Sequence, residues 1–287
     1  MRPVNLKTRI FLDGGDPSET KEIIGRLGFL DGQTTNPTLI SKNPAARRRI
    51  EQGKKFSKEE VLDFYRDVVL EISSLLPRGS ISVEVYADAS TKAEEMLQEG
   101  REMFSWIPNA QIKFPTISEG LKAAEQALSH GLRVNMTLCF TQEQAAAVYA
   151  ATKGAKKGAV FVSPFIGRLD DKGENGMDLI YNIIGMYREG DGHVEVLTAS
   201  VRSIDHLLYA LKLGSDIVTA PFGILREWGD RGLPVPGDEY SYDTGSLKAI
   251  PIKDIALTKD WSAYDISHGL TDKGLERFSS DWNSLIA

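Results

Sequence analysis

The chain has 287 residues, of which 41% are hydrophobic and 26% are charged, a mixture typical of a globular protein with a full-sized core. Its formal net charge of −6 argues against a nucleic-acid or an anionic-membrane partner. A single cysteine, Cys139, excludes an intrachain disulfide. No signal peptide, membrane-spanning apolar run, metal-ligand spacing or phosphate-binding glycine loop is apparent, so we expect a cytoplasmic protein.

Short apolar runs alternate with helical patterns along most of the chain. The predicted strands are Arg9–Asp13, Gln33–Asn36, Ile81–Tyr86, Gln111–Pro115, Val134–Cys139, Val160–Phe165, Glu195–Ser200 and Asp216–Ala220. The predicted helices are Pro17–Leu27, Lys58–Leu76, Thr91–Phe104, Ser118–His130, Gln142–Thr152, Met177–Tyr187, Ile204–Leu213 and Pro221–Trp228. Strands that alternate with helices indicate βαβ units and a parallel sheet.

Eight such units within this length predict an α/β fold, a single (β/α)8 TIM barrel that takes in residues 1–287. The alternative is a doubly wound open sheet, which would need a glycine-rich dinucleotide turn after the first strand. The turn at 13–16, Asp-Gly-Gly-Asp, is too short for that purpose. Three segments exceed the barrel: a basic extension at 41–57, a Gly- and Pro-rich excursion at about 229–267 after the last strand, and a C-terminal helix at about 270–284.

Lys113 stands in the middle of the fourth strand, A-Q-I-K-F-P. If Ile112 and Phe114 face a layer of helices, the period of two sends Lys113 into the barrel. Burying a lysine costs several kcal/mol unless the amine is paired or used, and one use is attack on a ketone to form a Schiff base. The alternative is an ion-paired or snorkelling lysine without chemistry.

The same parity places further polar side chains inside the barrel, near the carboxyl ends of the strands where barrel enzymes hold their active sites. The inward positions are Asp13, Asn36, Glu84, Lys113, Asn135, Thr137, Ser163 and Ser200. A barrel interior is normally filled by Val, Ile and Leu, so this polarity indicates either a site or a satisfied structural network. Glu84 and Lys113 lie on neighbouring strands and are predicted to share a hydrogen-bond network.

Two arginines follow the sixth and seventh strands, Arg168 in S-P-F-I-G-R-L-D-D and Arg202 in T-A-S-V-R. Near Ser200 they would suit a phosphate, which a planar guanidinium holds with two hydrogen bonds. The alternative is ordinary ion pairing with Asp170, Asp171 or Asp205.

Together these segments resemble the transaldolase family, in particular its short subfamily close to the fructose-6-phosphate aldolases. The matching segments follow the family's order over residues 10–228 and comprise F-L-D-G-G-D, T-T-N-P-T-L-I, I-S-V-E-V, I-K-F-P, V-N-M-T-L-C-F, S-P-F-I-G-R-L-D-D and T-A-S-V-R. The segment L-T-D-K-G-L-E-R-F-S-S-D-W matches the family's C-terminal helix. Gly14, where a threonine is usual, and the 229–267 excursion depart from the pattern.

The resemblance implies a class I aldolase barrel with no metal and no organic cofactor. Lys113 matches the Schiff-base lysine, and Asp13 matches the acid that takes the proton of the donor C4 hydroxyl. Glu84 matches an acid/base that works through a water, which Thr137 helps to hold. The substrate contacts implied are Asn36, Asn135 and Ser163 for the donor and imine, and Ser200, Arg168 and Arg202 for the phosphate end.

The expected activity is transfer of a three-carbon dihydroxyacetone unit from a ketose phosphate of fructose 6-phosphate type to an aldose phosphate, in the pentose phosphate pathway. The alternatives are a fructose-6-phosphate aldolase-like lyase and a transaldolase for another anionic ketose, such as a sulfonated fructose. Glu84, Asn135 and Phe165 favour transfer, because the aldolase subgroup typically differs at these positions. A non-catalytic sugar-phosphate-binding barrel would not need a buried amine. The expected partners are sugar-phosphate substrates and, in a homo-oligomer, further copies of the chain.

Overall fold

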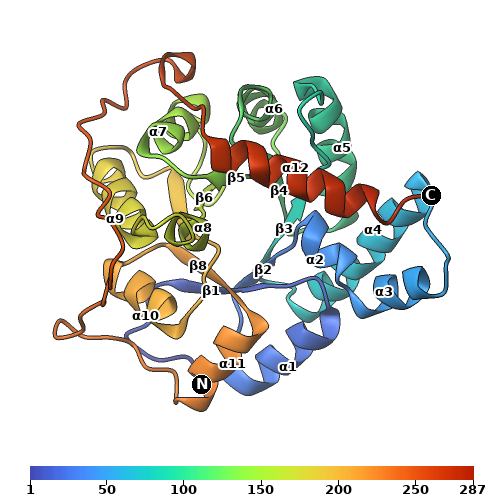
Figure 1. The fold of residues 1–287 in the computed structure, drawn as a ribbon, viewed down its shortest axis with the longest axis horizontal. Coiled ribbons are helices and arrows are strands. Elements are labelled where there is room, and N and C mark those ends of the chain that lie inside the picture. Colours follow the sequence, from blue (N-terminus) through green and yellow to red (C-terminus); the bar gives the residue numbers. More distant parts are fainter.

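The computed structural model describes residues 1–287 and shows eight parallel strands closed into a barrel in sequence order (Figure 1). Each strand pairs with the next one along the chain, and the first pairs with the last. The strands are β1 (Arg9–Asp13), β2 (Gly32–Thr34), β3 (Ser80–Glu84), β4 (Ala110–Pro115), β5 (Val134–Cys139), β6 (Val160–Pro164), β7 (Val194–Thr198) and β8 (Ile217–Pro221). The predicted TIM barrel is confirmed.

The helices surround this barrel. They are α1 (Pro17–Leu27), α2 (Pro37–Ser41), α3 (Pro44–Glu51), α4 (Lys58–Leu75), α5 (Ala93–Trp106), α6 (Ser118–Ser129), α7 (Gln142–Ala151), α8 (Ile166–Asp170), α9 (Gly176–Tyr187), α10 (Ile204–Leu213), α11 (Phe222–Asp230), a 3-10 turn η1 (Trp261–Ala263) and α12 (Gly269–Asn283). The sequence pattern did not predict α2, α3 and α8, because helices of five to eight residues are too short to show a period.

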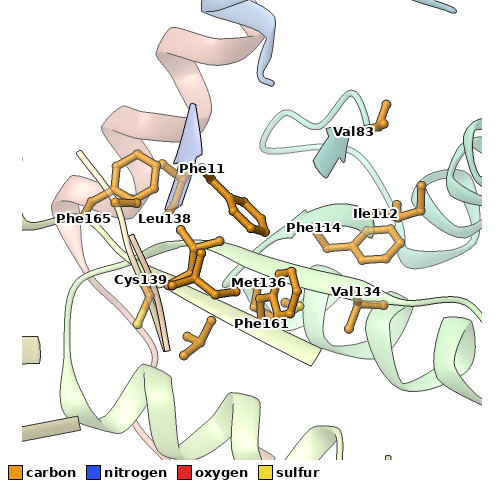
Figure 2. Close-up of a cluster of buried hydrophobic side chains, with 14 of the residues drawn as sticks. Phe11, Val83, Ile112, Phe114, Val134, Met136, Leu138, Cys139, Phe161 and Phe165 are labelled. Carbon is orange, nitrogen blue, oxygen red and sulfur yellow. The ribbon is translucent and has the colours of Figure 1, made fainter. Parts of the chain in front are cut away.

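The predicted orientation of the β4 side chains, alternately toward the helices and into the barrel, is confirmed. Ile112 and Phe114 belong to the buried hydrophobic cluster (Figure 2), and both face a helix, since a Cβ added at Gly100 of α5 would meet each side chain at 3.1 Å. Lys113 therefore points into the barrel, where only 3% of the residue is exposed. Helix α6 begins close to the end of the same strand, since a Cβ at Gly120 would lie 1.9 Å from the Pro115 carbonyl oxygen. A glycine at position 120 is required for this approach.

Side chains fill the barrel interior in layers, as in other barrels of this type. Near the amino ends of the strands, the Arg9 guanidinium pairs with Glu195 at 2.9 Å and lies over the Phe161 ring. Phe161 meets Phe11 edge to face at 6.2 Å in the next layer. Above these rings the interior becomes polar. These lower layers fill the barrel interior beneath the polar layer.

The excursion after α11 runs along the outside of the barrel past α10, α9 and α7 (Figure 1). Side chains of the barrel helices bind its backbone: Asn182 of α9 donates to the Ile250 carbonyl at 2.9 Å, and Gln142 of α7 donates to the Pro251 carbonyl at 2.9 Å. The excursion leads into α12, which crosses the carboxyl end of the barrel (Figure 1). The long excursion therefore connects the last βα unit to a helix on the opposite side of the barrel mouth.

No helix of the protein combines the length and the apolar character that crossing a membrane requires.

Glu99 of α5 offers a test of the packing beside the third strand. Burial raises the pKa of this carboxyl from 4.5 to about 7, although its oxygen accepts a hydrogen bond from the Tyr86 amide at 2.9 Å. The folded protein then holds a proton that the unfolded chain releases between pH 4.5 and 7, so stability falls as the pH rises through this window. Glu99→Gln should raise the free energy of unfolding at pH 8 by roughly 1–3 kcal/mol, and change little near pH 4.

Urea denaturation at the two pH values measures this difference, with the exposed Glu71→Gln of α4 as the matched control. A Glu99→Gln variant that loses stability at pH 8 would show that the carboxylate is ionised and needed there.

Candidate active site

A pocket of about 250 Å3 opens at the carboxyl ends of the strands, beneath α12. Its polar and charged lining comprises Asp13, Thr34, Asn36, Thr38, Lys42, Lys113, Thr137, Ser163, Arg168, Ser200, Arg202, Thr219 and Arg277. Phe165 and Phe278 form much of the apolar wall. Eight of the ten residues predicted from the sequence line this pocket. Glu84 and Asn135 do not line the pocket, but each contacts a residue that does: Glu84 pairs with Lys113, and Asn135 bonds Ser163.

Lys113 and Glu84 form an ion pair inside the barrel. The parallel register places the two residues side by side on β3 and β4, and Lys113 Nζ lies 2.8 Å from Glu84 Oε2. The predicted contact between these two side chains is confirmed. The oxygen lies off the line of a well-formed hydrogen bond, whereas the Thr35 carbonyl accepts from Nζ at 2.9 Å. With its side chain only 4% exposed, the amine has two protein partners and one open side that faces the pocket.

Both carboxyl groups near this amine are harder to ionise than usual. Burial raises the pKa of Glu84 above 4.5, and the charge of Lys113 opposes the rise. Burial likewise raises the pKa of Asp13 above 3.8. The charge of Lys113 and a hydrogen bond that Thr34 donates to Asp13 at 2.7 Å both lower this pKa, but by less. Two carboxyls with raised pKa values beside one amine can exchange protons with it, which is the arrangement that acid/base chemistry needs.

Asn135 and Ser163 belong to a chain of hydrogen bonds beside Lys113. The register pairs Asn135 with Lys113, and the Asn135 side chain donates to Ser82 at 3.1 Å and accepts from Ser163 at 2.6 Å. Thr137, two residues further along β5, is fully buried, and its hydroxyl has no partner within the protein. A buried hydroxyl that borders a pocket and lacks a partner is suited to binding a ligand or an ordered water.

Two of the predicted residues line the pocket from segments that follow the strands, and not from the strands to which they were assigned. Asn36 was assigned to the second strand, but β2 ends at Thr34, and Asn36 is the N-cap of α2, where its Oδ1 accepts from the Leu39 amide at 2.9 Å. Ser200 was assigned to the seventh strand, which ends at Thr198; its φ of +60° turns the chain after the strand. Strand parity therefore does not apply to either residue, although both lie at the pocket.

The two arginines differ in their surroundings. Arg168 of α8 is half-buried between two aromatic rings, 5.4 Å from Phe165 and 5.5 Å from Phe278, and burial lowers its pKa. Arg202 is more exposed and makes a two-pronged pair with Asp171 at 2.8 and 3.1 Å. Of the ion pairs considered from the sequence, this one forms. Asp170 instead binds His206 at 2.8 Å.

The sequence did not predict that α12 contributes to the pocket wall. Arg277 and Phe278 come from a segment recognised only as a C-terminal helix, and the sequence does not show which of its faces meets the barrel. Thr34 and Thr219 were also missed, although both lie on strands and their hydroxyls share a hydrogen bond at 2.6 Å. Parity could have found Thr219, since it occupies an inward position of the eighth strand.

No group of three or more His, Cys, Asp or Glu side chains in the protein is arranged to hold a metal ion.

Over residues 10–287 the sequence matches the family described as Transaldolase/Fructose-6-phosphate aldolase. The chain belongs to this family. Relatives named as probable transaldolases occur in Dehalococcoides mccartyi (34% identical, covering 96% of this chain and 99% of the relative), Herpetosiphon aurantiacus (35%, 96% and 96%) and an Anaeromyxobacter species (36%, 96% and 98%). The resemblance inferred from the motifs is confirmed, and the chain is a member of an enzyme family.

Among solved structures, 3-hexulose-6-phosphate synthase from Salmonella typhimurium aligns with a TM-score of 0.47 at 14% identity, over 78% of this chain and 97% of that one. The assignment of the barrel rests on the strand pairing described above.

The ion pair in this family member can be tested without an assay of activity. Lys113→Met should leave Glu84 buried without a partner and lower the free energy of unfolding by about 3 kcal/mol at pH 8. The loss should shrink toward pH 5, because the pKa of Glu84 is raised and the carboxyl can take up a proton instead of staying charged. Denaturation by urea at both pH values measures the effect.

The double variant Lys113→Met/Glu84→Gln, which carries no buried charge at this position, should recover most of the loss. An equal loss at both pH values, or no recovery in the double variant, would mean that lost packing rather than the ion pair sets the cost.

Proposed function

We propose that the protein is a transaldolase that transfers a dihydroxyacetone unit from a ketose phosphate of fructose 6-phosphate type to an aldose phosphate, through a Schiff base on Lys113. The observation that carries this proposal is an enclosed amine, 2.8 Å from one carboxylate, at the floor of a pocket whose mouth holds several arginines. Binding of a sugar phosphate alone would need the arginines but not the amine. This activity would place the protein in the pentose phosphate pathway.

The first step needs a neutral amine. When a ketose enters, Lys113 passes a proton to Glu84, whose raised pKa makes the carboxylate a suitable acceptor, and Nζ then attacks the C2 carbonyl. Glu84 gives this proton to the C2 oxygen and then carries a second proton from the nitrogen to the same oxygen, through a water bound at the free Thr137 hydroxyl, so that the oxygen leaves as water. The products of this step are a protonated imine and one molecule of water.

The imine nitrogen then acts as an electron sink. Asp13 takes the proton of the C4 hydroxyl, the C3–C4 bond breaks, and its electron pair passes to the imine, which becomes an enamine. The aldose phosphate leaves with the new C4 aldehyde. Asp13 is well placed as this base, because it lines the pocket while its carboxyl accepts a hydrogen bond from Thr34, whose hydroxyl also bonds that of Thr219.

The fate of the enamine decides between transfer and aldolase activity. No tyrosine, histidine or cysteine lines the pocket; the rings at its wall are those of Phe165 and Phe278. The only titratable side chain of β5 is the Cys139 thiol, and burial raises the pKa of this thiol to about 12. Without a phenol or imidazole to protonate it, the enamine persists until an acceptor aldehyde arrives. These features support a transferase over a fructose-6-phosphate aldolase-like lyase.

A two-substrate assay tests this function. With fructose 6-phosphate as donor, turnover with an acceptor aldose phosphate should exceed release of free dihydroxyacetone without it by at least roughly tenfold, which corresponds to about 1.4 kcal/mol in barrier height. The coupled release of glyceraldehyde 3-phosphate measures both rates. Rapid release of dihydroxyacetone in the absence of an acceptor would instead identify an aldolase.

Glu84→Gln supplies the matching variant. Glutamine can hold the water but cannot exchange its proton, so transfer should slow by a factor on the order of 10²–10⁴. In the unchanged protein, the acid side of the rate profile should reflect a carboxyl whose pKa lies above the ordinary values of 3.8 and 4.5, because burial raises both Asp13 and Glu84. A variant with the rate of the unchanged protein would remove Glu84 from the mechanism.

A further inference from the structure

Helix α12 forms part of the pocket although it lies far from the barrel strands in sequence. It crosses the mouth of the barrel (Figure 1) and contributes Arg277 and Phe278 to the lining that also holds Arg168 and Arg202. Phe278 supports Arg168 from one side, at 5.5 Å from its guanidinium carbon. A helix that only covered the barrel would not need an arginine directed at this mouth.

The position of α12 is fixed by close contacts at both ends. Near its start, Thr271 donates to the Leu138 carbonyl at 3.0 Å, and a Cβ added at Gly274 would lie 2.6 Å from Leu138 and 2.8 Å from the Arg168 guanidinium. Near its end, Asp281 accepts a short hydrogen bond from the Thr38 hydroxyl of α2. Arg277 is therefore held one turn after Gly274, on the same side as the arginine of α8.

The charge of Arg277 is poorly neutralised. Its one carboxylate neighbour is Asp281, with a separation of 3.7 Å between Nε and the oxygen that already binds Thr38. Arg202, by contrast, has both carboxylate oxygens of Asp171 within 3.1 Å. The charge of Arg277 also contributes to the lowered pKa of Arg168, as expected for two cations that face the same space.

We propose that Arg277 is a further ligand for the substrate's terminal anion and that it favours a phosphate over a sulfonate. This inference rests on the proposed function, and it names the anion that the same site selects. A phosphate monoester carries a charge of about −1.5 to −2 at pH 7, whereas a sulfonate carries a single charge at the same place. An additional guanidinium therefore stabilises the bound phosphate more than the bound sulfonate. Arg277 thus decides between the donors that the sequence leaves open.

Kinetics with three donors test the proposal: fructose 6-phosphate, its 6-deoxy-6-sulfonate analogue and unphosphorylated fructose. Arg277→Ala should raise KM about tenfold for the phosphate, only about threefold for the sulfonate and hardly at all for fructose, with kcat little changed. The matched control is Arg231→Ala. Arg231 follows α11, has similar exposure and pairs with Glu227 across one helical turn, as Arg277 does with Asp281, but does not line the pocket. This control should leave all three values unchanged.

Binding of glycerol 3-phosphate and of its sulfonate counterpart, measured by calorimetry, separates this inference from the proposed function because neither compound can react. Weaker phosphate binding in Arg277→Ala would support the anion role even if the unchanged protein transferred no ketol unit. Equal losses for all three donors, or unchanged binding of the phosphate, would overturn the role of Arg277 and leave the Schiff-base proposal standing.

Discussion

The structure depends on an amine and a carboxylate enclosed together in the barrel. Lys113 and Glu84 occupy adjacent positions on β4 and β3, and less than a tenth of either side chain is exposed. Separating the pair costs several kcal/mol. Polar groups surround it: the Thr35 carbonyl accepts a hydrogen bond from the amine, Asn135 lies beside Lys113 in the parallel register, and Asp13 and Thr137 line the pocket onto which the amine opens. Burial in the same enclosure raises the pKa of the Asp13 and Glu84 carboxyls, which suits them to move protons in the reaction that we propose.

The rest of the fold supports this arrangement by close packing at a few positions. The Phe11–Phe161 layer and the Arg9–Glu195 pair fill the barrel interior beneath the polar layer. Gly120 allows α6 to approach the end of β4, the strand that carries Lys113. At the open end, the excursion returns α12 over the mouth, where Phe278 supports Arg168 and Arg277 adds a charge. The long loop thus has a role in building the arginine-lined end of the pocket.

Much of the fold could be predicted from the sequence because the signals are local. Alternating apolar runs and helical periods predicted the barrel, and period-two parity placed Lys113 and Glu84 in its interior. Asn36 and Ser200 line the pocket as predicted, but not by strand parity, because they lie beyond the ends of their strands, one as a helix cap and the other in a turn with positive φ. The contribution of Arg277 could not be predicted, because the side on which a distant helix packs is set by tertiary contacts such as those of Thr271 and Gly274. Short helices such as α8 show no period at all.

The most direct test of the account is to trap the covalent intermediate. Sodium borohydride added during incubation with dihydroxyacetone or fructose 6-phosphate reduces an imine to a stable secondary amine, which peptide mass spectrometry can locate. A Schiff base on Lys113 predicts a three-carbon adduct on this lysine and on no other, and none in a folded Lys113→Arg variant, whose guanidinium is too basic to attack a carbonyl. An adduct on a different lysine, or an active protein that gives no adduct, would contradict it.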